Sequence, residues 1–396
     1  MDRQRAGHSI EVRWLIGAVL FFGCGARTEL GVPTSTHDGN DGGTPVPQQL
    51  ANYTQIACGE HHACALRDDG AVFCWGLDTS GQTGATPSPA SAPVQVGLAS
   101  PASAIGLGAY HSCAVVSGRV YCWGDDLVGQ VVGGGTSGPT PMYTGVNGAT
   151  GISGGYSHTC VSLTNGGIAC WGQNGEGQLG NGTTDFLGVP TGALVAQVTA
   201  ISRSAGASDH TCALVAGGGV RCWGSNVEGE IGNGSLAPVA SIPQLVLQAG
   251  AVDVAVVNFT TCAVMVDGTL RCWGEGAQGQ LGDGKVQSSD VPVVANVSGV
   301  RRIAVAERST CALREGGEVS CWGENFDGEL GDGTTTSSLT PVVAIQSGAT
   351  DVCAGGGHAC ALRDGRVLCW GSGIHGELGE ASPPQSSLPI PVAGLP

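Results

Sequence analysis

The sequence predicts an all-β fold, a seven-bladed β-propeller with four short strands per blade. A C-W-G triplet recurs along the chain, preceded by a second cysteine and followed in most copies by a G-[QE]-x-G tail. No ten-residue amphipathic helical pattern follows residue 50. The triplet tryptophans are spaced by 48, 48, 52, 50, 49 and 48 residues, at Trp75, Trp123, Trp171, Trp223, Trp273, Trp322 and Trp370. Seven such units indicate a propeller, which arranges its blades in a ring and leaves only short edges exposed.

The core of each unit is predicted to be a β-hairpin. In the sixth copy, residues 309–333, apolar and polar residues roughly alternate on both sides of a turn, as paired strands require. Two copies have the two-residue turns Ser117-Gly118 and Asp364-Gly365, and the other five have one more residue, as in 67–70. A final glycine there accepts the positive φ of a three-residue bulged loop. The spacing of the two hairpin cysteines, nine or ten residues, follows the loop length, so we expect them to face each other.

Two further strands are expected in each unit. A Pro-flanked apolar run such as Pro292-Val293-Val294 predicts an edge strand, where proline is tolerated. A second run, such as 300–304, ends near the next hairpin and predicts the inner strand.

The repeat resembles the RCC1 (regulator of chromosome condensation) repeat family, whose unit reads roughly G-x-x-H-[ST]-x-A-L-x-x-[DG]-G-x-V-[YF]-x-W-G-x-N-x-x-G-Q-L-G-x-G. The third copy matches it at Gly155, His158, Thr159, Trp171-Gly172, Asn174 and residues 177–182. The resemblance covers about residues 51–396 and implies RCC1-like repeats in a seven-bladed propeller.

The first 50 residues differ from the repeats. Residues 1–13 carry three arginines, and residues 14–23 form an apolar run that is too short to span a bilayer and is typical of a secretory signal. The run ends before Cys24 in the manner of a bacterial lipoprotein signal, although Phe21 and Phe22 depart from that pattern. We therefore expect residues 1–23 to be a lipoprotein-type signal peptide and Cys24 to be lipidated. An ordinary signal peptide and an uncleaved anchor are the alternatives.

Residues 24–50 contain proline, glycine and threonine but no apolar cluster, which predicts a flexible tether. Residues 51–396 are then the propeller. A lipidated cysteine before a tether favours a location in the cell envelope, at the outer membrane or cell surface, with secretion as the alternative. The membrane would be reached through the lipid anchor only.

Fourteen of the seventeen cysteines form hairpin pairs. Residues directly opposed in an antiparallel pair have Cα atoms within disulfide range, and an exported location favours oxidation. Buried free thiols are the alternative. The expected disulfides are Cys64–Cys74, Cys113–Cys122, Cys160–Cys170, Cys212–Cys222, Cys262–Cys272, Cys311–Cys321 and Cys360–Cys369.

Cys58 and Cys353 lie in the inner-strand segments of the first and last units, which a closed ring places side by side. A Cys58–Cys353 disulfide is therefore expected to clasp the ring. The two positions are offset by one residue, which in a regular strand would point the side chains to opposite faces.

The composition excludes a nucleic-acid footprint. The chain has 16 Lys and Arg against 32 Asp and Glu, a net charge of −16, and Lys285 is its one lysine. No G-x-S-x-G, H-E-x-x-H or P-loop motif occurs, so no enzyme, catalytic residue or cofactor is expected. A propeller enzyme with residues dispersed across blades is the alternative.

Histidine recurs two positions before the first hairpin cysteine. The seven residues there are His62, His111, His158, His210, Thr260, Ser309 and His358. Equivalent positions on different blades are spread around a ring and cannot converge on one ion, so a structural role at the blade edge is expected. Two cysteines per blade supply only half a zinc site, and acidic loops such as 325–333 lack EF-hand spacing. No metal site is predicted.

The expected function is binding by a rigid, monomeric scaffold in the cell envelope. The repeats define the scaffold, and the variable loop tips would select a protein or glycan partner. Exchange activity toward a GTPase, which the family resemblance implies, and a secreted enzyme or enzyme inhibitor are the alternatives. The repeat tryptophans are expected between blades. The candidate binding residues are Asp125, Asp126, Glu176, Glu324, Phe326 and Asp327.

Overall fold

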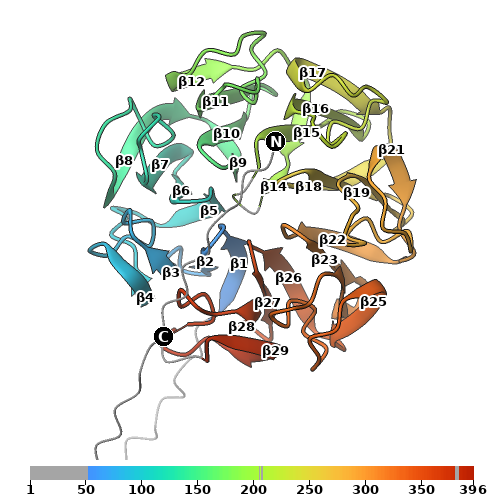
Figure 1. The fold of residues 1–396 in the computed structure, drawn as a ribbon. Helices are drawn as coiled ribbons and strands as arrows, with labels where there is room; N and C mark the ends of the chain where they lie inside the picture. The colour runs from blue at the N-terminus through green and yellow to red at the C-terminus, as the bar shows by residue number, and fades with distance from the viewer. Residues whose placement is uncertain (1–51, 205, 207, 380–382) are drawn as a thin grey trace, which may run out of the picture. The chain divides into compact units, whose positions relative to one another are not determined.

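Seven β-sheets surround a common centre in the computed structural model, which describes residues 52–204, 206, 208–379 and 383–396 (Figure 1). The predicted signal peptide, the tether and Cys24 lie outside the described residues. Among the residues that the structure describes, none belongs to a helix long and apolar enough to cross a membrane.

Each sheet is one blade, and its four main strands follow one another along the chain as A, B, C and D. Blades 1 and 2 are β1 (Tyr53–Cys58), β2 (His62–Arg67), β3 (Val72–Asp78), β4 (Ser88–Gln95), and β5 (Ala102–Leu107), β6 (His111–Val116), β7 (Arg119–Gly124), β8 (Gly138–Asn147). Blades 3 and 4 are β9 (Ala149–Gly154), β10 (His158–Leu163), β11 (Ile168–Gly172), β12 (Leu187–Gly192), and β13 (Val198–Ile201), β15 (His210–Val215), β16 (Gly219–Ser225), β17 (Val239–Leu247).

Blades 5 and 6 are β18 (Ala251–Val257), β19 (Thr260–Met265), β20 (Leu270–Gly274), β21 (Ser289–Val294), and β22 (Val300–Val305), β23 (Ser309–Arg314), β24 (Val319–Gly323), β25 (Ser338–Ile345), with the 3-10 turn η1 (Glu315–Gly317) between β23 and β24. Blade 7 is β26 (Ala349–Ala354), β27 (His358–Arg363), β28 (Arg366–Ser372) and β29 (Gln385–Pro391). The short strand β14 (Arg203–Ser204) leaves blade 4 and pairs in parallel with β18 of blade 5.

The strand order confirms the predicted inner and edge strands. Strand A lies at the centre of the ring and strand D at its rim (Figure 1). Because the main strands of a blade are antiparallel, the A–B and C–D connections lie at one end of the sheet and the B–C turns at the other. We call the side of the ring with the A–B and C–D connections the loop face, and the opposite side the turn face.

The hairpin turns have the predicted geometry. Ser117 and Gly118 have φ of 51° and 75°, and Asp364 and Gly365 have φ of 52° and 72°, so both two-residue turns use the left-handed region at both positions. In the longer turn of blade 1, Gly70 supplies the positive φ, at 82°. These are the conformations that match the right-handed twist of the flanking strands.

Each hairpin is joined by a disulfide in the predicted pairing. The two cysteines are directly opposite in the strand register, with Cα atoms 4.0–4.1 Å apart. The bonds are Cys64–Cys74, Cys113–Cys122, Cys160–Cys170, Cys212–Cys222, Cys262–Cys272, Cys311–Cys321 and Cys360–Cys369. Each pair packs toward the next blade, as Cys64 and Cys74 do against Ile105 and Leu107 of blade 2.

No strand is shared between the first and last blades, because β1 pairs within blade 1 and β29 within blade 7. The Cys58–Cys353 disulfide joins them, with Cα atoms 5.6 Å apart. The one-residue offset between the two cysteines does not keep their side chains apart, contrary to the expectation from a regular strand. Cys58 faces back toward blade 7, whereas Ala57, which matches Cys353 in register, packs toward blade 2. Because neighbouring blades face each other, residues of opposite orientation are the ones that meet.

The repeat tryptophans lie between blades, as predicted, and each makes the same hydrogen bond. All seven are at most 1% exposed. The indole Nε1 of Trp123 donates to the carbonyl oxygen of Gln82 in the preceding blade at 2.9 Å, and Trp75 donates to Glu377 of blade 7 at 2.7 Å. The other five tryptophans donate to Gln130, Gln178, Glu230, Gln280 and Glu329. The Gln or Glu of the G-[QE]-x-G tail is thus the acceptor in every blade.

The repeated histidines are structural, and they extend this network. The hydroxyl of Ser112 donates to the same Gln82 carbonyl at 2.8 Å, so its oxygen can accept from His62 Nε2 at 2.9 Å. Equivalent pairs join His111 to Thr159, His158 to Thr211 and His210 to Thr261. Burial lowers the pKa of His62 to about 3 and that of His111 to about 4, so both rings are neutral at neutral pH.

The network is incomplete where blade 7 meets blade 1. The position of Ser112 is Ala63 in blade 1, and neither ring nitrogen of the buried His358 has a hydrogen-bond partner among the described residues. We expect Ala63→Ser to raise the free energy of unfolding by about 1 kcal/mol, because its hydroxyl would supply a partner to a buried imidazole. Urea denaturation measures this change, and Ser112→Ala is the matched control, expected to lower stability by about 1–2 kcal/mol. A loss of stability in Ala63→Ser would show that the gap has no room for a hydroxyl.

Candidate functional site

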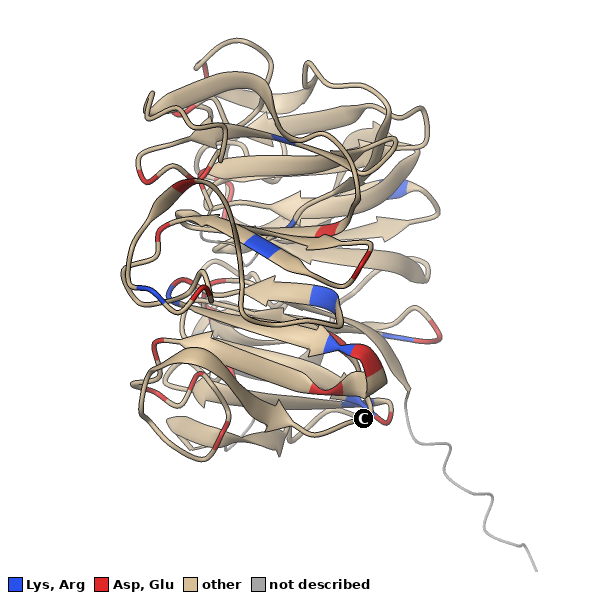
Figure 2. Cartoon of the chain, turned by 90° about the vertical axis from the view of Figure 1, so that its right-hand side faces the viewer, with Lys and Arg blue, Asp and Glu red and all other residues tan. Residues whose placement is uncertain are grey.

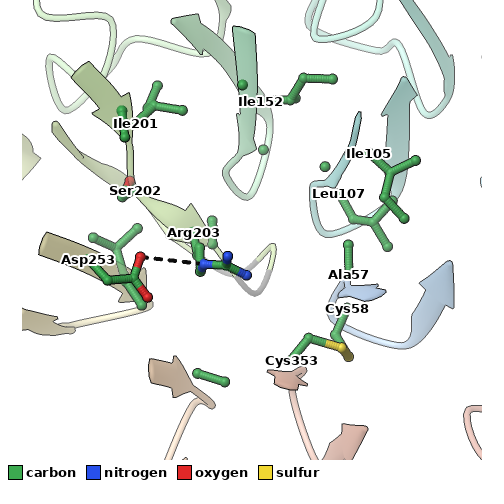
Figure 3. A pocket seen from close by; sticks show the side chains of 18 of the residues that line it. Ala57, Cys58, Ile105, Leu107, Ile152, Ile201, Ser202, Arg203, Asp253 and Cys353 are labelled. Atoms are coloured by element: carbon green, nitrogen blue, oxygen red, sulfur yellow. Dashed lines mark ion pairs between the residues drawn. A yellow bond between two sulfur atoms is a disulfide. The ribbon is translucent and has the colours of Figure 1, made fainter. Parts of the chain in front are cut away.

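The inner strands of all seven blades surround a cavity of about 280 Å³ (Figure 3). Most of its lining is small or aliphatic, including Ile105, Leu107, Ile152 and Ile201. Such a space can hold a small apolar group, and its few charged side chains decide what else it accepts.

Arg203 and Asp253 line the cavity, and they form a charged cluster with Arg302 and Asp351, which lie outside its lining. Arg302 Nη1 lies 2.6 Å from Asp351 Oδ1, and Arg203 Nη1 approaches the same oxygen at 3.4 Å. Arg203 Nε is also 3.4 Å from Asp253 Oδ1 (Figure 3). Burial raises the pKa of Asp253, an effect that Arg203 and Arg302 oppose. The four charges cancel, so this cluster gives the cavity no net charge.

The aspartates of this cluster also connect neighbouring blades. In three blades, a side-chain oxygen at the third position of strand A accepts a hydrogen bond from a backbone N–H of the next blade's inner strand. The bonds join Gln55 Oε1 to Ile105 N at 3.1 Å, Asp253 Oδ2 to Ile303 N at 3.4 Å, and Asp351 Oδ2 to Ile56 N at 3.2 Å. These three pairs of adjacent inner strands form no β-pairing with each other, and the side chains satisfy the backbone N–H groups instead. We therefore interpret the charged cluster as structural.

The loop face carries the predicted binding residues, but it does not expose all of them. Asp126 is only 2% exposed, and its Oδ1 accepts the backbone N–H groups of Val131 and Val132 at 2.9 and 3.1 Å. The same bond to the residue five positions ahead is made by Asp78, Asn174, Asn226 and Asn325. The expectation that Asp126 is a binding tip is therefore wrong, because the residue shapes the C–D loop from inside.

Asp125 and Glu176 are partly exposed on the same face. Asp125 accepts from Gln130 Nε2 at 2.7 Å and from Ser137 Oγ at 2.8 Å, which fixes its carboxylate within the loop. Glu176 lies beside Asp209 of the next blade, and the pKa of Asp209 is raised by burial and by this neighbouring charge.

Two more predicted residues, Glu324 and Asp327, line an acidic pocket of about 170 Å³ between blades 6 and 7. Its lining is Glu307, Arg308, Ser309, Glu324, Asp327, Glu329, Gly356 and Gly357. The two glycines occupy the A–B loop of blade 7 and leave the space open. Arg308 Nη1 lies 3.4 Å from Oε2 of the buried Glu324. The lining contains three further carboxylates and no second basic side chain, so acidic groups outnumber the one guanidinium. The pKa of Glu329 is raised by burial and by the charges of Asp327 and Glu324.

Apolar side chains project from the C–D loops at one repeat position. Leu127 is 77% exposed, Val227 54%, Phe326 70% and Ile374 67%. Of these four, only Phe326 is among the binding residues predicted from the sequence. An alignment of the seven units shows the other three in the sequence, because all four residues stand two positions before the first glycine of the G-[QE]-x-G tail. Phe326 lies next to Asp327 of the acidic pocket, so the loop face combines apolar contacts with negative charge.

The edge-on view in Figure 2 shows that many Asp and Glu residues lie in loops and that Lys and Arg residues are sparse. The chain thus offers a partner mainly carboxylates and apolar tips.

Two groups of side chains in the described residues have metal-ligand chemistry. Cys58, His358 and Cys360 come together, but both cysteines are in disulfides and cannot ligate. His61, His375 and Glu377 have ligand atoms within 4.8 Å of one another. Neither histidine belongs to the repeated set at the blade edge, so the repeat pattern does not indicate this group.

The fold and these repeats define a seven-bladed propeller whose blades share one sequence unit. A family profile for the Regulator of chromosome condensation (RCC1) repeat matches residues 69–115, 165–214, 267–313 and 316–362, and a second profile for this repeat matches 53–82, 149–178, 201–230 and 251–280. The chain belongs to the RCC1 repeat family.

Solved structures share the fold at low sequence identity. Human WBSCR16 is 22% identical, with a TM-score of 0.71, over 81% of this chain and 93% of that one. Prp20p from Saccharomyces cerevisiae, studied for its binding to Gsp1p and histones, is 18% identical with a TM-score of 0.72, over 86% and 87%. The yeast protein bound to Kap60 gives 16% and 0.71, over 91% of each chain. At these identities the likeness establishes the fold.

Proposed function

We propose that the chain is a non-catalytic binding scaffold whose loop face engages a protein with a basic surface. The observation that carries the proposal is the acidic pocket between blades 6 and 7, with Phe326 exposed beside it. A lysine or arginine side chain of a partner fits a pocket in which carboxylates outnumber the one guanidinium, while an exposed aromatic ring supplies apolar contact area. A net charge of −16 favours association with a cationic partner.

Neighbours in fold support a protein as partner. Prp20p has been studied for binding to Gsp1p and histones and has been solved with Kap60. Histones are basic proteins, which is the chemistry that the acidic pocket favours. A glycan has no cationic group to occupy this pocket, so we favour a protein.

A binding role also agrees with the burial of the two serine and histidine pairs that lie at hydrogen-bonding distance in the described residues. Ser112 Oγ lies 2.9 Å from His62 Nε2, and both residues are buried. Ser208 Oγ lies 3.0 Å from His210 Nδ1, but both residues are buried and the hydroxyl donates to the His210 carbonyl at 2.7 Å. A substrate cannot reach either hydroxyl without rearrangement of the blade.

The expected location is the cell envelope, with the propeller held by lipid on Cys24, or else secretion. The eight disulfides support an oxidising compartment. Membrane fractionation of the full chain and of Cys24→Ser tests the anchor, and unchanged membrane association of the variant would contradict it.

The proposal is tested by affinity capture with the full chain and two variants. We expect Phe326→Ala combined with Asp327→Asn to remove partners that the wild-type chain retains, and retention to weaken as salt rises. Val266→Ala is the matched control, because Val266 is 77% exposed but lies in a B–C turn on the turn face. Partners that survive the loop-face change and disappear with Val266→Ala would show that the binding face has been misassigned.

Regulation of a GTPase by nucleotide exchange is the second candidate. It is supported by family membership and by the fold shared with Prp20p. Acceleration of nucleotide release from a GTPase captured in the same experiment would favour it over a passive scaffold.

A further inference from the structure

We propose that His61, His375 and Glu377 form a binding site for one divalent transition-metal ion, of the zinc class, where blade 7 meets blade 1. The site goes beyond the proposed partner binding and does not depend on it. Two imidazoles and one carboxylate are the donor set that zinc, cobalt and nickel accept, whereas Mg²⁺ and Ca²⁺ prefer oxygen donors only.

The ligand atoms are already gathered at the loop face. Their mutual distances are within 4.8 Å, and His61 Nδ1 lies 3.6 Å from Glu377 Oε1. The two imidazole rings have centroids 4.9 Å apart at 57°. Metal–nitrogen bonds of about 2.0–2.1 Å place tetrahedral ligand atoms about 3.4 Å apart, so side-chain movements of about 1 Å suffice.

The carboxylate is fixed by the repeat itself. Glu377 is 1% exposed, and its Oε2 accepts the backbone N–H of His375 at 2.8 Å. In each of the six remaining blades, the side chain of the tail's Gln or Glu accepts the backbone N–H of the residue two positions before it. Blade 7 therefore holds one oxygen of Glu377 in place and leaves Oε1 directed to His61.

A second carboxylate lies behind His61. Glu60 Oε1 is 3.6 Å from His61 Nε2, while Nδ1 faces Glu377. A metal on Nδ1 would leave Nε2–H to donate to Glu60, the arrangement that commonly orients histidine ligands. We assign Glu60 as a positioning residue rather than a ligand.

Ring closure creates this group once. His375 is the C–D loop residue that directly precedes the G-[QE]-x-G tail, and His61 is the A–B loop residue that directly precedes the first residue of strand B in the next blade. At the other six interfaces neither of these two positions is a histidine. Between blades 3 and 4, for example, the same positions are Glu176 and Asp209. The His61 side chain is 30% exposed, so an ion can reach the site and water can complete its coordination.

The test measures metal binding by the full chain in excess Mg²⁺, which occupies sites made of carboxylates alone. Isothermal titration with Zn²⁺ and the visible absorption of bound Co²⁺ are the two readouts. We expect one equivalent to be lost, or its affinity to fall more than a hundredfold, in His61→Ala combined with His375→Ala. Glu60→Gln is expected to lower affinity roughly 10–100-fold while keeping one equivalent.

Glu176→Gln combined with Asp209→Asn is the matched control and should keep wild-type binding. His8 and His37 lie outside the described residues and are present in every variant, so the difference between variants isolates the proposed site. Zn²⁺ should also raise the melting temperature of the wild-type chain by several degrees at a roughly hundredfold excess over Kd, and leave that of the double-histidine variant unchanged.

Two results would overturn the site: equal binding by the wild-type chain and the double-histidine variant, or no Zn²⁺ bound by the wild-type chain. Circular dichroism in EDTA checks that the variants are folded. If alanine disturbs the fold, His61→Gln and His375→Gln, which keep most of the side-chain volume, give the same comparison.

Discussion

Replacing both Cys58 and Cys353 with alanine is expected to lower the free energy of unfolding by roughly 3–5 kcal/mol. The disulfide closes a segment of 295 residues, and in the chain-entropy model the stabilisation grows with the length of the closed loop. Much of the effect acts on the unfolded chain, which the bond keeps from expanding.

The variant should also open at one place. Without a shared strand, β1 and β26 are held together by side-chain and loop contacts, such as Gly356 N to Glu60 O at 2.8 Å and Trp75 Nε1 to the Glu377 carbonyl at 2.7 Å (Figure 1). These contacts should keep the ring closed on average but allow local opening. Hydrogen exchange is expected to be faster at the amides of β1 and β26 than at those of β13.

Urea denaturation gives the change in stability, and Cys113→Ala combined with Cys122→Ala is the control. That hairpin disulfide has a sequence separation of 9, so its loss should cost roughly 2–3 kcal/mol and leave exchange at the blade 1 and 7 interface unchanged. If removing the clasp costs less than the control and leaves exchange in β1 and β26 unaltered, ring closure does not depend on the disulfide.

The scaffold could be predicted from the sequence because each blade repeats the same local sequence pattern. The alternation around Cys311 and Cys321, the turn glycines and the loop-dependent cysteine spacing each specify a hairpin without reference to distant residues. Their sevenfold recurrence then specifies the ring. The position of Trp322 between blades followed from the same alternation.

The sites depend on which units meet, and local patterns do not contain that information. The pairing of Arg203 with Asp351 joins residues 148 positions apart, and His61 meets His375 only when the ring closes. The orientation of Cys58 and Cys353 was misjudged for a related reason, since a single-sheet argument ignores that two blades face each other.

Asp126 illustrates a different limit. Its carboxylate resembles an exposed acidic tip in the sequence, but the backbone of its own loop needs an acceptor. Asn174 and Asn325 at the equivalent position would have indicated this role, because an amide oxygen accepts the same N–H without charge.

Replacing Trp223 with alanine is expected to lower the free energy of unfolding by roughly 3–5 kcal/mol. The side chain is fully buried between blades 3 and 4, packed with Leu179 and Ile201, and its Nε1 donates to the Gln178 carbonyl at 2.8 Å. A β-carbon on Gly180 would lie 2.6 Å from the indole nitrogen, so the loop backbone closes directly over the ring. Alanine would leave a large cavity that this fixed backbone cannot fill.

Trp223→Phe separates the two contributions, because it keeps most of the buried ring but removes the donor. Its loss should be smaller than that of Trp223→Ala. The difference from the wild-type chain includes about 0.5–1.5 kcal/mol for the lost hydrogen bond, because the Gln178 carbonyl keeps the bond from Thr211 Oγ1 at 3.1 Å. Phe326→Ala is the control, since a side chain 70% exposed should change stability by no more than about 0.5 kcal/mol. Urea denaturation of the three variants measures these differences. Similar small losses in all three would mean that the tryptophan does not bind the blades together and is available for a partner instead.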